Sequence, residues 1–132
     1  MDIKSVILAA GKGTRMKSET SKVLHEIYGK PLLGYVLDAV KNIASENFVI
    51  VGHHAEDVST FVEKNYQNAK TVLQSPQLGT GHAVSMVCPS LENYDGLVVI
   101  LYGDTPLITE DTIEKFVDFH KKQNSDLTVM ST

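Results

Sequence analysis

A glycine-rich turn near the start of the chain, followed by a lysine, combines residue types that bind phosphate groups. Gly11 and Gly13 allow backbone N–H groups to come close to an anion, because glycine has no side chain in the way. Arg15 and Lys22 can neutralise negative charge, and arginine offers a planar pair of donors. Thr14 adds a hydroxyl group. This combination predicts a site for a polyphosphate.

The spacing of the glycines differs from that of the two best-known phosphate loops. Met16 stands where the dinucleotide-binding fingerprint has its third glycine, and the G-x-x-x-x-G-K-[ST] pattern of the P-loop is absent. The glycines alone would fit equally well a tight strand-to-helix turn that binds nothing. The neighbouring cations favour phosphate binding over that alternative.

A second block, which begins at Gln74, has the residue types that can recognise a nucleotide base. The amide of Gln74 offers both a donor and an acceptor, which matches the alternating edge of uracil. Gly79 and Thr80 follow, and a glycine leaves room for a base to approach the backbone. Residues 79–81 could equally be the start of a helix with Thr80 as its N-cap, and the two interpretations are compatible.

Asp104 is the candidate metal ligand. It follows the apolar run 97–101 and the pair Tyr102 and Gly103. A carboxylate at the end of a buried strand is well placed for Mg²⁺, which keeps several waters and takes one or two carboxylates plus substrate phosphates. The alternative is an aspartate that caps a turn, which Gly103 and Pro106 would favour. Together with the other two blocks, we favour the metal.

The elements that must position these residues alternate between strand and helix patterns. Apolar runs predict strands at 6–8, 47–51, 71–73, 97–101 and 127–130. Periodic apolar residues predict helices from Pro31, around 58–62, from Gly79 and after Thr109. This alternation predicts an α/β fold with a doubly wound, mostly parallel sheet and helices on both faces. The three blocks then follow strands and should meet at the carboxyl edge of the sheet, where such folds bind ligands.

Composition limits the other possibilities. A chain of 132 residues with 42% apolar content forms one domain. A net charge of −4 without a long basic cluster predicts no nucleic-acid or anionic-membrane surface, and we find no signal peptide or membrane span. We therefore expect a cytoplasmic protein. The single cysteine, Cys88, excludes an internal disulfide, and its apolar neighbours predict that it is buried.

The motifs resemble those of the sugar-1-phosphate nucleotidyltransferases. Segment 8–16 is similar to their L-A-G/A-G-x-G-T-R-M signature, Lys22 to the lysine that follows it, and 29–32 to a later K-P-L segment. The resemblance is strongest to the uridylyltransferase domain of the bifunctional N-acetylglucosamine-1-phosphate uridylyltransferases. It rests on the Q-x-x-Q-L-G-T-G-H-A block at 74–83 and the Y-G-D block at 102–104.

This resemblance implies a Rossmann-like fold and formation of UDP-N-acetylglucosamine, a cell-wall precursor, from UTP and a sugar 1-phosphate. It implies that Lys22 and Arg15 are catalytic and that Asp104 holds Mg²⁺ together with a later asparagine. The nucleotide-binding residues that it implies are Leu8, Ala9, Ala10, Gly11, Gly13, Thr14, Lys22, Gln74, Gly79, Thr80, Tyr102, Gly103 and Asp104. A general base is not needed, because a phosphate monoester with a second pKa of about 6 is already largely ionised.

The family's domain is longer than this chain, so the resemblance covers its amino-terminal part. We expect residues 1–132 to be the nucleotide-binding part of an incomplete domain. The acceptor pocket, the second metal ligand and an acetyltransferase domain that could form a homo-oligomer would lie beyond Thr132. We therefore expect the isolated chain to bind a uridine nucleotide without completing the reaction. The alternatives are a non-catalytic nucleotide-binding module and a related cytidylyl- or thymidylyltransferase.

Overall fold

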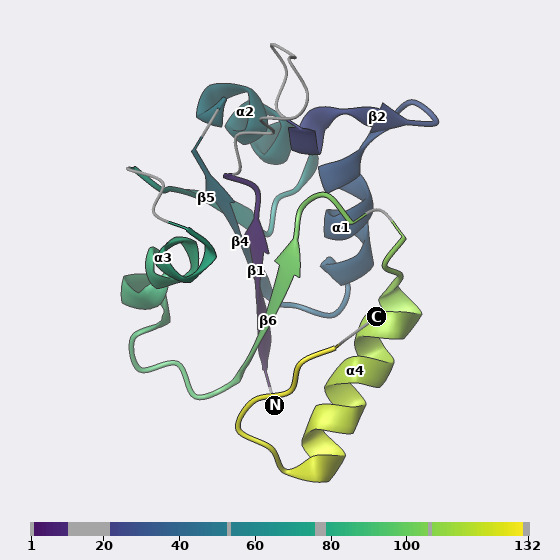
Figure 1. Cartoon of the computed structure of the whole chain (residues 1–132), viewed down its shortest axis with the longest axis vertical. Helices are drawn as coiled ribbons and strands as arrows, with labels where there is room; N and C mark the ends of the chain where they lie inside the picture. Colours follow the sequence, from purple (N-terminus) through teal and green to yellow (C-terminus); the bar gives the residue numbers. More distant parts are fainter. Residues whose placement is uncertain (1, 11–21, 53, 76–78, 106, 131–132) are drawn as a thin grey trace.

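The computed structural model describes residues 2–10, 22–52, 54–75, 79–105 and 107–130, and its centre is a parallel sheet of four strands (Figure 1). The strands are β1 (Ile3–Leu8), β4 (Glu46–Val51), β5 (Ala69–Leu73) and β6 (Leu97–Tyr102). Their order is β5-β4-β1-β6, and every neighbouring pair is parallel. Each strand contains the run that its apolar residues predict, and each is longer than that run at one end or both.

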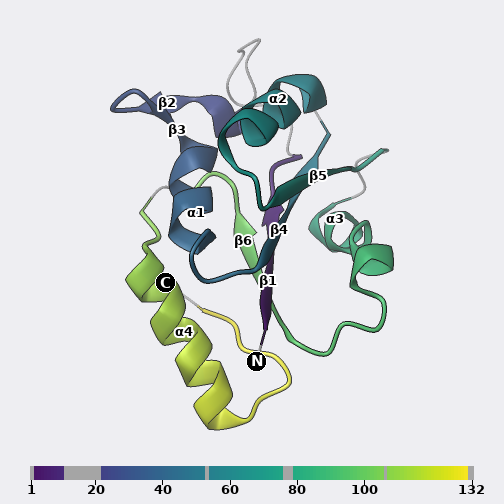
Figure 2. The same cartoon turned by 180° about the vertical axis from the view of Figure 1, so that it is seen from behind.

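Helices cover the two faces of the sheet unequally. The helices are α1 (Leu32–Val40), α2 (Ala55–Asn65), α3 (Thr80–Ser85) and α4 (Glu110–Gln123). Figure 1 and Figure 2 show α1, α2 and α4 on one side of the sheet and α3 on the other. The larger core lies on the first side, where Ile7, Leu37 and Ile113 are fully or almost fully buried. A smaller core of Phe48 and Ile50 lies under α3. The doubly wound α/β prediction is confirmed.

The strand order determines where a ligand can bind. The chain adds strands outward from β1 through β4 to β5, and then returns to place β6 on the other side of β1. In open parallel sheets, the reversal of direction leaves a crevice beyond the carboxyl ends of the two strands that flank it. Here those strands are β1 and β6. The segments that follow them in the sequence are the glycine-rich one that includes Gly11 and Gly13, and the block that ends in Asp104.

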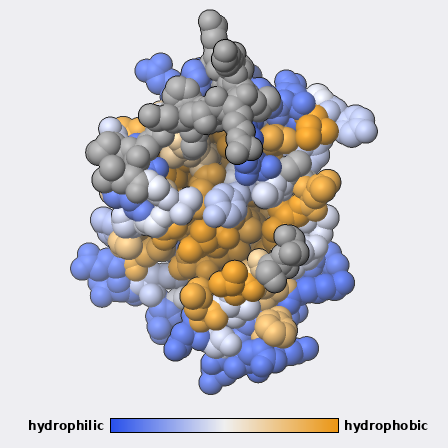
Figure 3. All heavy atoms as spheres, in the orientation of Figure 1, coloured by the Kyte–Doolittle hydropathy of each residue, from blue (hydrophilic) through white to orange (hydrophobic). Residues whose placement is uncertain are grey.

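The face of β6 that points away from the larger core remains apolar and exposed. Val98, Ile100 and Tyr102 alternate along the strand and are 39%, 49% and 55% exposed. Figure 3 shows apolar side chains gathered in the middle of the face seen in Figure 1, where β6 lies in front. Helix α3 packs on the other part of this face, against β1 and β4.

The strand predicted at 127–130 is absent, which corrects the sequence analysis. These residues pair with no strand among those described, and Leu127 and Val129 are 79% and 78% exposed. The segment lies against α4 instead, where His120 Nδ1 is 2.7 Å from Thr128 Oγ1. Alternating apolar residues favour a strand only where a neighbouring strand and a core face accept them, and α4 offers neither.

Three smaller expectations also need correction. Pro31 is the N-cap of α1 rather than its first residue, and Gly79 rather than Thr80 is the N-cap of α3. Cys88 is exposed, because α3 ends at Ser85 and the chain then turns into a short 3-10 helix, η2 (Cys88–Leu91). Within the described part of the chain, no helix is both long enough and apolar enough to cross a membrane.

A short hairpin that the sequence analysis did not predict connects Lys22 to α1. It consists of β2 (Glu26–Ile27) and β3 (Lys30–Pro31), and it follows the 3-10 helix η1 (Lys22–Leu24). Tyr28 and Gly29 form the turn with φ angles of 55° and 76°. A positive φ at both central residues matches the twist of paired strands, and glycine adopts it readily.

An ion-pair network joins three strands at the amino end of the sheet. Glu46 lies between Lys70 and Lys4, with N···O distances of 2.8 Å and 3.4 Å. The hydrogen bond from Lys70 lowers the pKa of the Glu46 carboxyl below its ordinary value of 4.5. Lys4 also lies over the ring of Tyr94, 4.6 Å from its centre. This network is remote from the carboxyl edge and serves the fold.

The lowered pKa of Glu46 makes part of the stability depend on pH. The folded carboxyl binds its proton less readily than the unfolded one, so its stabilisation is complete above pH 4.5 and is lost as the pH falls through the folded pKa. We expect Glu46→Gln to lower the free energy of unfolding near neutral pH and to have little effect in acid. Urea unfolding at both pH values measures this, with the exposed Glu114→Gln as control. An equal loss at both pH values would contradict the assignment.

Candidate functional site

The structure describes most of the residues that the sequence analysis assigned to the site. Gly11, Gly13, Thr14 and Arg15 lie outside the described residues. The described ones are Leu8, Ala9, Ala10, Lys22, Gln74, Gly79, Thr80, Tyr102, Gly103 and Asp104. All of these except Lys22 lie at or just beyond the carboxyl end of a strand, or at the start of the helix that follows one.

Lys22 and Asp104 form an ion pair across the crevice. The Lys22 Nζ and Asp104 Oδ2 atoms are 3.1 Å apart, although the residues are far apart in the sequence. The two side chains remain 47% and 34% exposed, so both are open to a ligand. The structure therefore brings the predicted phosphate-binding cation and the predicted metal ligand to one point.

Close packing of the backbone positions this pair. The Gly103 N–H donates to the Leu8 carbonyl oxygen at 2.9 Å, which continues the pairing of β6 with β1 to the residue before Asp104. A Cβ atom at Gly103 would lie 3.1 Å from that oxygen and 3.2 Å from Val23 Cγ1. Val23 is buried next to Lys22, so a side chain at Gly103 would push the two segments apart.

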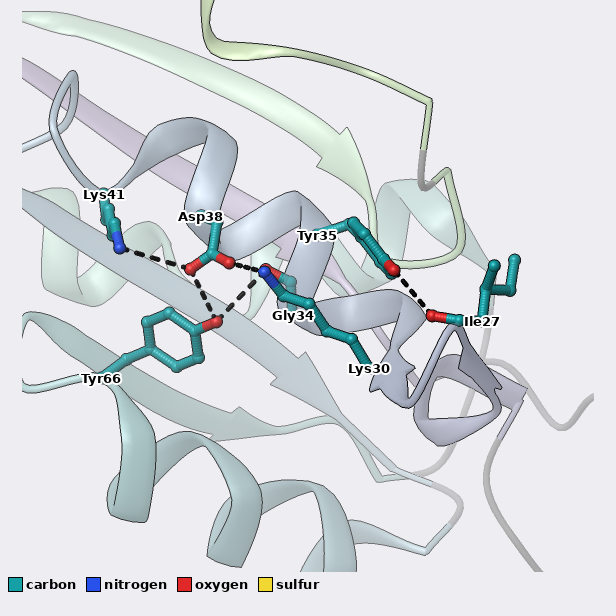
Figure 4. Close-up of polar contacts among 7 residues, drawn as sticks. All are labelled: Ile27, Lys30, Gly34, Tyr35, Asp38, Lys41 and Tyr66. Carbon is teal, nitrogen blue, oxygen red and sulfur yellow. Dashed lines mark hydrogen bonds and ion pairs between the residues drawn. The ribbon is translucent and has the colours of Figure 1, made fainter.

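A polar cluster around Asp38 anchors the hairpin that follows Lys22 (Figure 4). Asp38 on α1 forms ion pairs with Lys30 on β3 and, at 3.5 Å, with Lys41. The Tyr66 hydroxyl is 2.9 Å from Asp38 Oδ1 and 3.2 Å from the Gly34 carbonyl oxygen, and it donates to these acceptors. Burial raises the pKa of the Tyr66 hydroxyl, which keeps it protonated as a donor.

Tyr35 completes the attachment of the hairpin to α1. Its hydroxyl donates to the Ile27 carbonyl oxygen at 2.6 Å (Figure 4). Lys30 Nζ lies 4.9 Å from the centre of the Tyr35 ring, a cation–π distance. Because the hairpin is fixed at both strands, the segment that begins with Lys22 has a defined position relative to the sheet.

Among the site residues that the structure describes, Gln74 is the most buried polar one. It follows β5 directly and is only 3% exposed. Its backbone N–H donates to the Val51 carbonyl oxygen at 2.8 Å. Its side-chain nitrogen, Nε2, lies 3.0 Å from the Gly79 carbonyl oxygen and 2.9 Å from His82 Nδ1. Gly79 has a φ of 106°, which strongly favours glycine at this position.

The backbone that follows β1 is buried and partly engaged. Ala9 and Ala10 are 1% and 6% exposed, and the Ala9 N–H donates to the Ile50 carbonyl oxygen at 2.9 Å. That hydrogen bond holds the end of β1 against β4.

A metal ion at this site would depend on Asp104 for its protein ligand. Among the residues that the structure describes, no cluster of three His, Cys, Asp or Glu side chains could hold an ion. A single partly exposed carboxylate beside a phosphate site matches the needs of Mg²⁺, which commonly takes one or two carboxylates and completes its shell with phosphate oxygens and water. The donor set therefore fits a divalent cation that arrives with a nucleotide.

The sequence analysis missed two features of the site. It gave no chemistry to His82, which contacts Gln74, and it did not predict the hairpin that anchors Lys22. The contact of His82 could have been suspected because Gln74 and His82 lie in one sequence block. The second had a signal in Tyr28 and Gly29, a pair that can adopt positive φ in a two-residue turn.

Comparison with known proteins gives a consistent group of relatives. The family model of the MobA-like NTP transferase domain matches residues 5–132. The bifunctional protein GlmU of Alkaliphilus oremlandii is 47% identical over 133 aligned residues, which cover 100% of this chain and 28% of that protein. The chain thus spans little more than a quarter of the length of this relative.

Solved structures of similar proteins share the fold. HddC from Yersinia pseudotuberculosis, complexed with GMP-PN, superposes with a TM-score of 0.72 and 26% identity, and the match covers 89% of this chain and 53% of that one. Rv0371c from Mycobacterium tuberculosis, in complex with manganese, superposes with a TM-score of 0.68 and 22% identity, over 92% of this chain and 61% of that one. At that identity the second match speaks for the fold alone.

Proposed function

Because this chain belongs to the MobA-like NTP transferase domain family, we propose that it is the nucleotide-binding part of a uridylyltransferase. The reaction would join UTP and N-acetylglucosamine 1-phosphate, form UDP-N-acetylglucosamine and release pyrophosphate. The 47% identity to a GlmU protein along the whole chain supports this choice of substrates. The relative is much longer, so the activity is proposed for a polypeptide that contains this chain.

The observation that carries the proposal is the meeting of Lys22 and Asp104 at the crevice between β1 and β6. Gln74 lies at the end of β5, on the other edge of the same sheet. Three strand spacings separate β5 from β6, about 14 Å in all. A nucleotide can span such a sheet edge, with its base at Gln74 and its phosphates near Lys22.

In this arrangement each residue has one task. Lys22 neutralises charge on the α-phosphate while the acceptor's phosphate oxygen attacks the α-phosphorus. Arg15 and the amides of 11–14 hold the β- and γ-phosphates that leave as pyrophosphate. Asp104 would hold Mg²⁺, which neutralises charge shared between the nucleotide and the sugar phosphate. The acceptor oxygen is already ionised, so the protein needs only to align and neutralise the reactants.

The neighbouring proteins support part of this proposal. The HddC structure is described as complexed with GMP-PN, and the Rv0371c structure, which shares the fold, as a complex with manganese. We propose Mg²⁺ and UTP for this chain, because Asp104 offers a hard oxygen ligand and Gln74 suits a pyrimidine. A cytoplasmic location would give access to both substrates.

Base recognition gives the first test of the proposal. We expect UTP to bind this chain more tightly than CTP, by about tenfold or more, because cytosine reverses a donor and an acceptor against the buried Gln74 and leaves polar groups unpaired. Calorimetric titration with both nucleotides in the presence of Mg²⁺ measures the difference. Equal affinities would mean that the 74–83 block only begins a helix.

A turnover assay separates the enzyme from a non-catalytic nucleotide-binding module. Radiolabelled UTP and N-acetylglucosamine 1-phosphate are supplied to this chain, and also to the chain joined to the remainder of the GlmU relative. We expect UDP-N-acetylglucosamine from the longer protein. Tight UTP binding with no product from the longer protein would favour the module.

A further inference from the structure

We infer that His82 is a positioning residue that sets the base selectivity of the site, because it accepts a hydrogen bond from Gln74 and leaves only the carbonyl oxygen of that amide for the nucleotide. This inference deepens the proposed function and rests on it. Gln74 is the base-recognition candidate, and His82 lies in the first turn of α3, in contact with the Gln74 side chain.

The orientation of the Gln74 amide follows from its partners. The side-chain nitrogen lies 3.0 Å from the Gly79 carbonyl oxygen, and a carbonyl oxygen can only accept. The atom that faces Gly79 must therefore be the nitrogen, since the alternative orientation would place two oxygens in contact. The same nitrogen lies 2.9 Å from His82 Nδ1.

The tautomer of His82 follows from the same contact. An amide nitrogen donates and does not accept, so His82 Nδ1 must present a lone pair to it. The imidazole is then neutral with its proton on Nε2. Both hydrogens of the Gln74 amide are used, one by Gly79 and one by His82. Within the described part of the chain, Gln74 makes its side-chain hydrogen bonds through this nitrogen only.

The atom of Gln74 that remains for a ligand is the acceptor Oε1. An acceptor in a residue that is only 3% exposed favours a base with a hydrogen on its ring nitrogen, as in uracil and thymine at N3. Cytosine has a lone pair at N3 and would meet that oxygen with another acceptor. Without His82, the amide nitrogen still faces Gly79, but its second hydrogen is released and can donate to cytosine.

A pair of variants tests this role. His82→Leu removes the acceptor, whereas His82→Asn keeps one, because the asparagine carbonyl oxygen is attached to Cγ just as Nδ1 is. We expect His82→Leu to lower the ratio of UTP to CTP affinity by about tenfold, the effect of one hydrogen bond in a buried site. His82→Asn should restore most of the ratio. A role in folding alone would change both affinities together and leave the ratio intact.

His120→Leu is the matched control, because His120 contacts Thr128 beside α4, away from the three site blocks. It should leave the affinity ratio unchanged. A His82→Leu protein that is folded by circular dichroism and keeps the full preference for UTP would overturn the inference. A wild-type chain that binds neither nucleotide would overturn the proposed function first, and the inference with it.

A measurement without nucleotide tests the geometry directly. Nitrogen NMR of the imidazole rings at mildly alkaline pH, where histidines are neutral, distinguishes the two tautomers. We expect the proton of His82 on Nε2 and an unprotonated Nδ1 that is coupled to the Gln74 side-chain amide. A proton on Nδ1 would overturn the inference, even if the His82→Leu protein fails to fold.

Discussion

Lys22→Ala should weaken UTP binding by about 10- to 100-fold, the effect of losing a charge-assisted hydrogen bond to a phosphate. Lys22 is the cation that the structure places at the crevice, 3.1 Å from Asp104, and its side chain is 47% exposed. Because so much of it is exposed, the fold should tolerate its loss. Calorimetry with UTP and Mg²⁺ measures the affinity, and thermal unfolding checks that the variant is folded.

Lys41→Ala is the matched control for Lys22→Ala. Lys41 is 48% exposed and also pairs with an aspartate, Asp38, but it lies at the end of α1 and away from the carboxyl edge of the sheet. It should leave UTP affinity unchanged. In a longer, active protein that contains the chain, Lys22→Ala should also slow the reaction by about 10²- to 10³-fold, since charge on the transferred phosphoryl group would be less stabilised. Wild-type affinity and turnover in the variant would remove Lys22 from the mechanism.

Arg15 shares this expectation but depends on the sequence alone. It lies outside the described residues, and its role is inferred from the match of residues 8–16 to the family's L-A-G/A-G-x-G-T-R-M signature. Arg15→Ala should lower turnover in the same assay. The two alanine variants can then be compared. Lys22 has an ion-pair partner in the structure, whereas the assignment of Arg15 comes only from its motif.

The strands of the sheet could be predicted from the sequence because each carries a run of apolar residues. The run 97–101 is continuous and apolar, a pattern typical of a parallel strand that is buried on both faces, and β6 includes it, although one face of β6 is exposed in the structure. The run 127–130 has similar apolar residues, but it lies against α4 and pairs with no described strand. Local pattern cannot distinguish these cases, since the difference lies in whether a distant strand is free to pair.

The site could be predicted in its residue types and not in its contacts. The order of the predicted strands placed Gln74 and Asp104 on one sheet edge, because the carboxyl ends of parallel strands share that edge, and Lys22 was assigned from its motif. The ion pair between Lys22 and Asp104 depends on the hairpin from Glu26 to Pro31, which has only two residues in each strand. Such short strands carry too few residues for a periodic signal. The Gln74–His82 contact depends on the positive φ of Gly79, which a sequence does not report.

Asp104→Asn should strengthen UTP binding when no divalent cation is present and weaken it when one is. Without the cation, the Asp104 carboxylate repels the phosphates and holds Lys22 in an ion pair. Removing that charge should therefore strengthen UTP binding by up to about fivefold, the limit for a pair this exposed. Titration in the presence of a chelator measures this effect.

With Mg²⁺, the wild-type chain should bind UTP more tightly than Asp104→Asn does. The wild-type chain should bind UTP more tightly than it does in chelator, because Asp104 would then hold a cation that offsets the charge of the phosphates. In Asp104→Asn, the increase in UTP affinity on adding Mg²⁺ should be smaller by a factor of about ten or more, since an amide is a weaker ligand for a hard cation than a carboxylate. Asp111→Asn is the control, because Asp111 pairs with Lys115 on α4 at 3.0 Å and is 72% exposed, outside the three site blocks. A variant that is weaker than the wild type by the same factor in chelator and in Mg²⁺ would make Asp104 a turn-capping residue. The inversion needs both roles of Asp104, as partner of Lys22 in the free chain and as metal ligand in the nucleotide complex.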